Sequence, residues 1–190
     1  MEITIASPKG GLAPLDQNSV NMFKSDESSM RFLNEHKELW EKTRPLVNFA
    51  GRAADFDAIF YPGGHGPMFD LAEDHGSQQL AADFHDAGKV VAAVCHGPAA
   101  LLDVRVAGGA PLLAGRRVTG FSNAEEDAGG YTDVMPFALE TRLREVSGGG
   151  FVKADQDWAE KVVVDGRVIT GQNPASARGV GEAIVKAIGA

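Results

Sequence analysis

The stretch VVAAVCHGPAALL, residues 90–102, decides the fold and holds the only cysteine of the chain. Its first five residues are small or β-branched and apolar, which predicts a parallel strand covered on both faces. Gly97 and Pro98 then lead into a second apolar run, and proline is well tolerated in the first turn of a helix. A strand, a tight turn and a helix would place Cys95 at the turn, where a nucleophile can project into the crevice beside the sheet.

Two interpretations of Cys95 stay open on these residues alone. A free cysteine often behaves as a small buried hydrophobe. Alternatively, the N–H groups and the dipole at the start of the helix would favour a thiolate, with His96 as the nearest base in the sequence. For a nucleophile we expect a strained backbone at Cys95 and a sulfur that lies in a crevice rather than in the core.

The composition is that of an ordinary globular protein, with 190 residues of which 44% are hydrophobic and 23% are charged. We expect one domain over residues 1–190. The net charge of −8 argues against nucleic acid or an anionic membrane as a partner. A single cysteine and a start without a signal peptide or an apolar span fit a reducing, cytoplasmic location.

Short apolar runs alternate with helix-like segments, as in β-α-β units around a parallel sheet. We expect strands at residues 3–6, 58–61, 89–94, 112–114, 117–121, 162–164 and 167–170. We expect helices at residues 29–43, 77–87, 97–103, 136–146 and 175–188. Together these predict a doubly wound, flavodoxin-like α/β fold with a mostly parallel sheet, helices on both faces and a helical insertion near the start. Asp165-Gly166 is the strongest hairpin signal.

Three loops follow predicted strands, namely Ser7–Gly11, Gly63–Gly66 and Cys95–Pro98. The carboxyl ends of parallel strands share one edge, so we expect these loops to converge there. The second loop lies in YPGGHGPMFDL, residues 61–71, and its consecutive glycines could present backbone N–H groups as an oxyanion hole. A plain turn is the alternative. The loop lacks the Gly-Lys-Ser/Thr ending of a phosphate-binding loop.

A third stretch, VTGFSNAEED at residues 118–127, offers Glu125, Glu126 and Asp127. One of these carboxylates could orient His96 and complete a Cys-His-acid set, although a solvated acidic loop would look the same. The five histidines, at positions 36, 65, 75, 85 and 96, show no spacing typical of zinc ligands. We therefore predict no structural metal.

The combination of YPGGHGPMFDL, VVAAVCHGPAALL, VTGFSNAEE and VVVDGRVITGQNPAS resembles the ThiJ/PfpI superfamily over essentially the whole chain. More narrowly, it is similar to the glyoxalase III branch, whose members are also described as stress-inducible holding chaperones and protein deglycases. The resemblance implies that Cys95 is the nucleophile, His96 its partner base and Glu126 the acid. It also implies an oxyanion hole made of the backbone N–H groups of Gly64 and His65.

The branch converts methylglyoxal and related 2-oxoaldehydes to 2-hydroxy acids such as D-lactate, without glutathione, metal or any other cofactor. The resemblance thus implies a cysteine-dependent lyase that acts on a small molecule, in a cytoplasmic homodimer that binds neither nucleic acid nor membrane. Family members carry a further strand and helix ahead of the segment matched by Met1–Ala6, with a glutamate that contacts the cysteine. The chain as given has no counterpart, because Glu2 would lie at the wrong end of the strand. We therefore expect a weakened glyoxalase.

Two other functions remain open. The first is a cysteine hydrolase of the same superfamily, such as an amidase or peptidase. A glutaminase is disfavoured because residues 165–190 lack the histidine that its catalytic pair requires. The second is a non-catalytic holding chaperone or redox sensor. Formation of D-lactate from methylglyoxal separates the lyase from both.

Overall fold

A computed structural model describes residues 2–189 of the chain. Its backbone contacts divide the chain into two units, Met1–Phe49 and Ala50–Ala190. Each unit has its own sheet. The single domain expected over residues 1–190 stays a prediction.

The first unit combines a small parallel sheet with short helices. Its elements are β1 (Ala6–Ser7), α1 (Gln17–Met22), α2 (Glu27–Glu35), α3 (Lys37–Glu41), β2 (Arg44–Pro45) and the 3₁₀ helix η1 (Leu46–Phe49). Strands β1 and β2 pair in parallel. The side chains of Asp16 and Asp26 accept hydrogen bonds from the first N–H groups of α1 and α2, which explains where these two helices begin.

Two predictions for this unit are wrong. The strand expected at residues 3–6 is limited to Ala6–Ser7 and belongs to the two-stranded sheet, where Pro45 has no N–H to extend the ladder. The helix expected at residues 29–43 is interrupted at His36, whose backbone angles (φ −125°, ψ 31°) are not helical. A further helix, α1, precedes the predicted one, in a stretch where no helix was expected.

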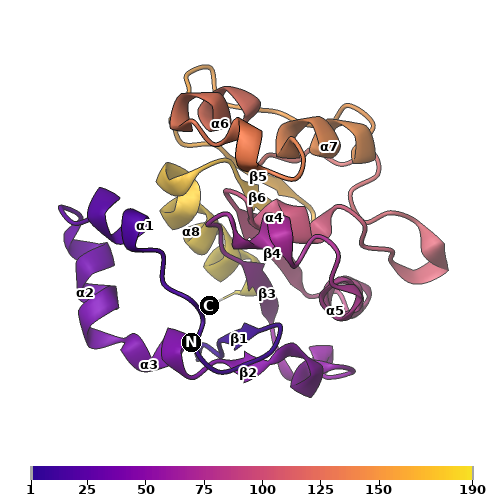
Figure 1. The fold of residues 1–190 in the computed structure, drawn as a ribbon. Coiled ribbons are helices and arrows are strands. Elements are labelled where there is room, and N and C mark those ends of the chain that lie inside the picture. The colour runs from indigo at the N-terminus through magenta and orange to yellow at the C-terminus, as the bar shows by residue number, and fades with distance from the viewer. Residues whose placement is uncertain (1, 190) are drawn as a thin grey trace. The chain divides into compact units, whose positions relative to one another are not determined.

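The second unit contains a four-stranded sheet with strand order β3-β4-β6-β5 (Figure 1). Its strands are β3 (Ala58–Tyr61), β4 (Val90–Val94), β5 (Val162–Asp165) and β6 (Val168–Gly171). Strand β4 is parallel to both of its neighbours, and β5 and β6 form an antiparallel hairpin. Gly166 has φ 62° in the hairpin turn, a conformation that glycine adopts without strain. The predicted β3, β4 and hairpin are thereby confirmed.

Helices surround this sheet. They are α4 (Gly66–Phe69), α5 (His75–Asp86), α6 (Asn123–Gly129), α7 (Leu139–Val146) and α8 (Ala177–Ile188). Short 3₁₀ helices occur at η2 (Ala53–Asp55), η3 (Gly97–Leu101), η4 (Ala107–Gly109), η5 (Thr132–Val134) and η6 (Pro174–Ser176). In the described residues, no helix combines the length and the apolar character that crossing a membrane requires.

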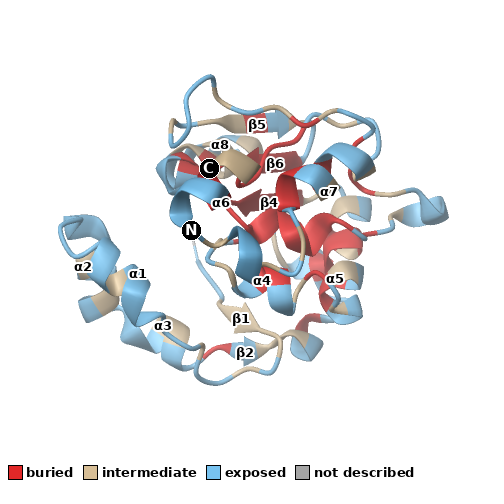
Figure 2. Cartoon of the chain, turned by 45° about the horizontal axis from the view of Figure 1, so that its top comes forward, coloured by how far each residue is buried: buried red, intermediate tan, exposed pale blue. Residues whose placement is uncertain are grey.

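The central strand β4 is covered on both faces. Helix α5 packs on β3 and β4, and α8 packs on β4, β5 and β6. The two helices lie on opposite sides of the strands in both views (Figures 1 and 2). Every residue of β4 is buried, as its apolar sequence predicts. The fold is therefore α/β with a mostly parallel, flavodoxin-like sheet.

Several boundaries in this unit differ from the predictions. The segment expected as a strand at residues 112–114 is a turn, and the segment expected at residues 117–121 forms only an isolated bridge, in which Val118 pairs with Phe151 of a loop. Helix α5 begins at His75, two residues before the predicted start, and Asp74 caps it. Helix α7 begins at Leu139, three residues after Pro136, and the helix expected at residues 97–103 is the shorter η3.

Candidate active site

Cys95 lies at the turn between β4 and η3 in a strained backbone conformation. Its φ angle is +63°, a value that residues other than glycine rarely adopt. The Cys95 N–H donates to the carbonyl of Gly171 at 3.0 Å, and its carbonyl accepts from the N–H of Phe121 at 2.9 Å. The neighbouring segments therefore hold the strained turn from both sides, and the predicted strain is confirmed.

The loop that follows β3 packs directly against this turn. A side chain at Gly97 would collide with the backbone carbonyl of Tyr61, at the end of β3. A Cβ atom at Gly63 would lie 2.5 Å from the Cβ atom of Cys95. Glycine at both positions lets the two strand-end loops approach closely enough to share one site.

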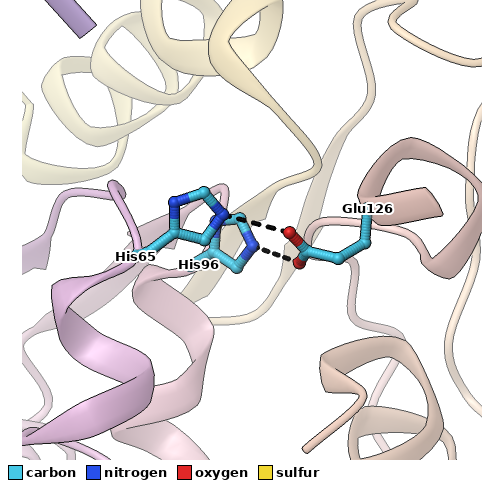
Figure 3. Close-up of side chains that lie close together, drawn as sticks. All are labelled: His65, His96 and Glu126. Carbon is cyan, nitrogen blue, oxygen red and sulfur yellow. Dashed lines mark hydrogen bonds and ion pairs between the residues drawn. The ribbon is translucent and has the colours of Figure 1, made fainter. Parts of the chain in front are cut away.

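Figure 3 shows two histidines and one carboxylate that meet, namely His65, His96 and Glu126. The Cys95 Sγ lies 3.3 Å from His96 Nδ1, and His96 Nε2 lies 2.6 Å from Glu126 Oε2. The other carboxylate oxygen, Oε1, lies 3.0 Å from His65 Nε2. His65 comes from the loop after β3, His96 from the turn after β4 and Glu126 from the first turn of α6.

Aromatic rings enclose the two imidazoles. The ring centroids of His65 and His96 are 4.3 Å apart. His65 also faces Tyr131 at 4.8 Å, and His96 faces Phe121 at 4.4 Å. The exposed fraction of the side chain is 35% for His65, 11% for Glu126 and 2% for His96. Solvent therefore reaches this group from the His65 side.

Glu125, the neighbour of Glu126, fixes the start of α6. Ser122 and Glu125 form a reciprocal capping box, and Glu125 is completely buried. Its carboxylate also accepts hydrogen bonds from the Trp158 N–H and from the side chains of Gln172 and Asn173. Burial alone would raise the pKa of Glu125, but the hydrogen bonds from Asn173, Ser122 and Gln172 lower it below its usual value.

The same balance applies to Glu126. Burial would raise the pKa of this carboxyl group, but the hydrogen bonds and positive charge that His96 and His65 can supply lower it. Glu126 is consequently ionised near neutral pH and acts only as a hydrogen-bond acceptor. Both histidines must then carry a proton on Nε2, which leaves Nδ1 of a neutral His96 as the acceptor facing the thiol.

Cys95 itself has a neutral thiol near neutral pH. Burial raises its pKa to about 11, and the charges of Glu126 and Glu125 add to the rise, against the backbone N–H groups of Gly64 and His96. The backbone N–H groups at the turn do lower the pKa of the thiol, as expected, but burial outweighs them. Cys95 is buried, with 9% of the residue's surface exposed, and the crevice expected for its sulfur stays a prediction.

Residues 41–187 match the sequence model of the DJ-1/PfpI family. The chain belongs to this family. Glyoxalase 3 of Candida albicans is 33% identical over 193 residues, which cover 98% of this chain and 81% of that protein. Glutathione-independent glyoxalase HSP31 of Saccharomyces cerevisiae is 34% identical over 142 residues, 72% of this chain and 57% of that protein.

Two solved structures agree with the fold. The crystal structure of glyoxalase III from Candida albicans superimposes with a TM-score of 0.84 at 30% identity, over 98% of this chain and 80% of that chain. The structure of Rapid Encystment Protein 24 KDa from Francisella tularensis gives a TM-score of 0.82 at 33% identity, over 97% and 80% of the two chains. The predicted resemblance to ThiJ/PfpI proteins is confirmed.

Within this DJ-1/PfpI site, the structure brings together Cys95, His96 and Glu126, as predicted. The other two acidic residues of the stretch point elsewhere, since Glu125 caps α6 and Asp127 accepts from the Thr132 hydroxyl. The Ser-x-x-Glu spacing from Ser122 is a capping-box pattern that could have assigned Glu125 to this structural task.

The backbone N–H groups of Gly64 and His96 act on the Cys95 thiol and lower its pKa. The oxyanion hole expected from the N–H groups of Gly64 and His65 faces a substrate oxygen and stays a prediction. One feature of the site was missed. The contact between the His65 ring and Glu126 spans 61 residues, and no local pattern in the sequence signals it.

Proposed function

We propose that this chain is a glutathione-independent glyoxalase that converts methylglyoxal and related 2-oxoaldehydes to 2-hydroxy acids, with D-lactate as the product of methylglyoxal. One observation carries the assignment of roles: the strained Cys95 places its sulfur 3.3 Å from an imidazole whose opposite nitrogen is held by Glu126. The relatives named as glutathione-independent glyoxalases support the same activity.

The reaction begins with a proton transfer from Cys95 to His96. A thiol with a pKa of about 11 is a poor nucleophile at neutral pH, so the thiolate must form together with attack on the substrate. Nδ1 of His96 accepts the thiol proton at the position that the Glu126 contact leaves free. The imidazolium that results is stabilised by the Glu126 carboxylate.

In the remaining steps one carbon of the substrate is oxidised and its neighbour is reduced, so no external oxidant or reductant is needed. Sγ bonds to the aldehyde carbon, and the oxygen of that carbon takes the proton from His96, which gives a hemithioacetal. His96 then removes the hydrogen of this carbon as a proton and returns it to the neighbouring keto carbon. The hydroxyl proton of the former aldehyde carbon passes to the keto oxygen, so that the former aldehyde carbon becomes a thioester and the keto carbon becomes an alcohol. Water cleaves the thioester and releases the 2-hydroxy acid and the thiol.

The test is formation of D-lactate from methylglyoxal in the absence of glutathione, measured with a stereospecific lactate assay. We expect activity in the wild-type chain and none in Cys95→Ser. Glu126→Gln should lose about 10²- to 10⁴-fold in kcat, because the amide no longer fixes the His96 tautomer. The matched control is Glu73→Gln, an exposed residue of the second unit, which should retain the wild-type rate.

Two results would contradict the proposal. If Cys95→Ser keeps the wild-type rate, the sulfur is not the nucleophile. If the folded wild-type chain releases no D-lactate but cleaves amide or peptide substrates, it is a cysteine hydrolase instead. Lack of both activities would favour a holding chaperone or redox sensor. The homodimer, the cytoplasmic location and a possible deglycase or chaperone activity stay predictions.

A further inference from the structure

We infer that His65, His96 and Glu126 form a binding site for a divalent transition-metal ion such as Zn²⁺, and that an ion bound there switches the thiol chemistry off. Each of these residues offers a ligand atom, and the three atoms lie within 4.8 Å of one another. Across residues 2–189, no other group of three such side chains converges as closely. The binding step does not depend on the proposed function, whereas the inhibition rests on it.

The donor set suits zinc. Two imidazole nitrogens and one carboxylate oxygen are the three protein ligands of many zinc sites that keep an open fourth position. Tetrahedral bonds of about 2.0–2.1 Å place neighbouring ligand atoms about 3.3 Å apart. The two Nε2–carboxylate distances are 3.0 and 2.6 Å, each to a different oxygen of Glu126, so the ligand atoms need to separate by about 0.3 and 0.7 Å.

The geometry also provides an entrance and a charge. The His65 ring is 35% exposed, which gives an ion access and leaves the ring room to adjust. Both oxygens of the Glu126 carboxylate face imidazole nitrogens, Oε1 toward His65 and Oε2 toward His96. A cation bound between these atoms would replace the two N–H contacts of the carboxylate.

Metal binding changes the proton on His96. At present the Nε2–H of His96 faces Glu126, and Nδ1 faces the Cys95 sulfur. A metal bound at Nε2 displaces the proton from this nitrogen, and the neutral ring then carries its proton on Nδ1. The nitrogen beside the sulfur then holds a proton already, and it cannot accept the proton of the thiol. The ion would thus inhibit without touching Cys95.

This arrangement differs from capture of the ion by the cysteine. Sγ lies beside Nδ1, on the opposite side of the imidazole ring from the nitrogen that would bind the metal. The inference therefore requires nitrogen and oxygen ligands only. A site built on the thiolate would instead need Cys95.

The experiment is a calorimetric titration of the untagged full chain with Zn²⁺. We expect one ion per chain, with unchanged affinity in Cys95→Ser and in His75→Gln, a histidine exposed on α5 that serves as the matched control. His65→Gln and Glu126→Gln should each weaken binding by at least about tenfold. Loss of a residue that only supports a ligand already costs about 10- to 100-fold, and loss of a ligand should cost no less. Binding that is unaffected by His65→Gln, or abolished by Cys95→Ser, would overturn the inference.

A second measurement uses the wild-type chain and does not depend on how the variants fold. Zn²⁺ should shift the ring ¹⁵N resonances of two of the five histidines, in the pattern of ligation through Nε2. Co²⁺ in place of Zn²⁺ should give visible bands without the near-ultraviolet band of a thiolate ligand. A thiolate band, or shifts at other histidines, would overturn the assignment.

Activity then separates the two proposals. D-lactate formation should fall in proportion to Zn²⁺ occupancy and return when a chelator removes the ion. A chain that binds Zn²⁺ but forms no D-lactate refutes the proposed function and keeps the metal site. An active chain that binds no Zn²⁺ refutes the site and keeps the function, and an active chain with the ion bound refutes the switch.

Discussion

Replacing Glu125 with glutamine tests whether this carboxylate supports the fold of the site. Five hydrogen bonds reach it: Ser122 N–H and Oγ–H on Oε2, and Trp158 N–H, Gln172 Nε2–H and Asn173 Nδ2–H on Oε1. An amide must turn its NH₂ toward one of these sets. The less costly orientation faces Ser122, whose hydroxyl can rotate to accept, but whose backbone N–H then loses its acceptor.

One unsatisfied buried N–H costs about 1–3 kcal/mol, and each of the three remaining bonds loses about 1 kcal/mol when its acceptor becomes neutral. We therefore expect Glu125→Gln to lower the free energy of unfolding by about 4–6 kcal/mol, and to lower Tm by roughly 15 °C. Urea denaturation followed by circular dichroism measures the first quantity, and calorimetry the second.

The exposed Glu73→Gln is the matched control, and its stability should stay within about 0.5 kcal/mol of the wild type. Should Glu125→Gln also stay within about 1 kcal/mol, the five hydrogen bonds would not stabilise the chain as argued here. Glu125 would then be merely tolerated in its buried position.

Three further predictions concern backbone packing, pH and the exposed histidine. Gly97→Ala should lower the free energy of unfolding by about 3 kcal/mol or more in a denaturant titration, because the added Cβ atom would collide with the Tyr61 carbonyl. A variant as stable as the wild type would mean that the turn can shift. Burial raises the pKa of the Cys95 thiol from 9.0 to about 11 and that of Tyr61 from 10.0 to about 12. A group whose pKa is higher in the folded state stabilises the fold fully at pH values below its unfolded-state pKa. The free energy of unfolding should therefore be highest below pH 9 and should fall as the pH rises through 11 to 12. Cys95→Ser should lack the part of this fall that belongs to the thiol. His65→Gln should lower kcat and change its pH profile, since Glu126 loses one of the two rings that hold it; an unchanged profile would make the contact incidental.

Much of the sheet could be predicted because its strands carry local signals. Strand β4 is apolar at every position, β3 ends at a glycine-rich loop, and Asp165-Gly166 marks the hairpin. The segment at residues 117–121 has equally β-prone residues but fails to form a strand. Its Val118 N–H bonds to the Gly150 carbonyl and its Thr119 N–H to the Thr170 hydroxyl, so its partners are a loop and a side chain. Such pairing depends on tertiary packing that local sequence does not encode.

The candidate site was likewise predictable only in part. The turn at Cys95 could be predicted from adjacent residues, because a strained turn between a buried strand and a helix has a characteristic sequence. The state of its thiol could not, since the pKa depends on burial and on carboxylates about 30 residues away. The His65 ring was likewise beyond the reach of local pattern, as only the folded chain brings it to Glu126.

The two contacts of Glu126 also have a mechanical consequence. One carboxylate joins the loop after β3, through His65, to the turn after β4, through His96, while α6 anchors it. Burial raises the pKa of Glu126, but the two histidines lower it by more, so its pKa lies below the usual value. When the pH falls through this lowered pKa, the carboxylate takes up a proton and both contacts are lost at once. The backbone amides of α4, η3 and α6 should then exchange with deuterium as one cooperative unit, well before the buried strand β4 opens.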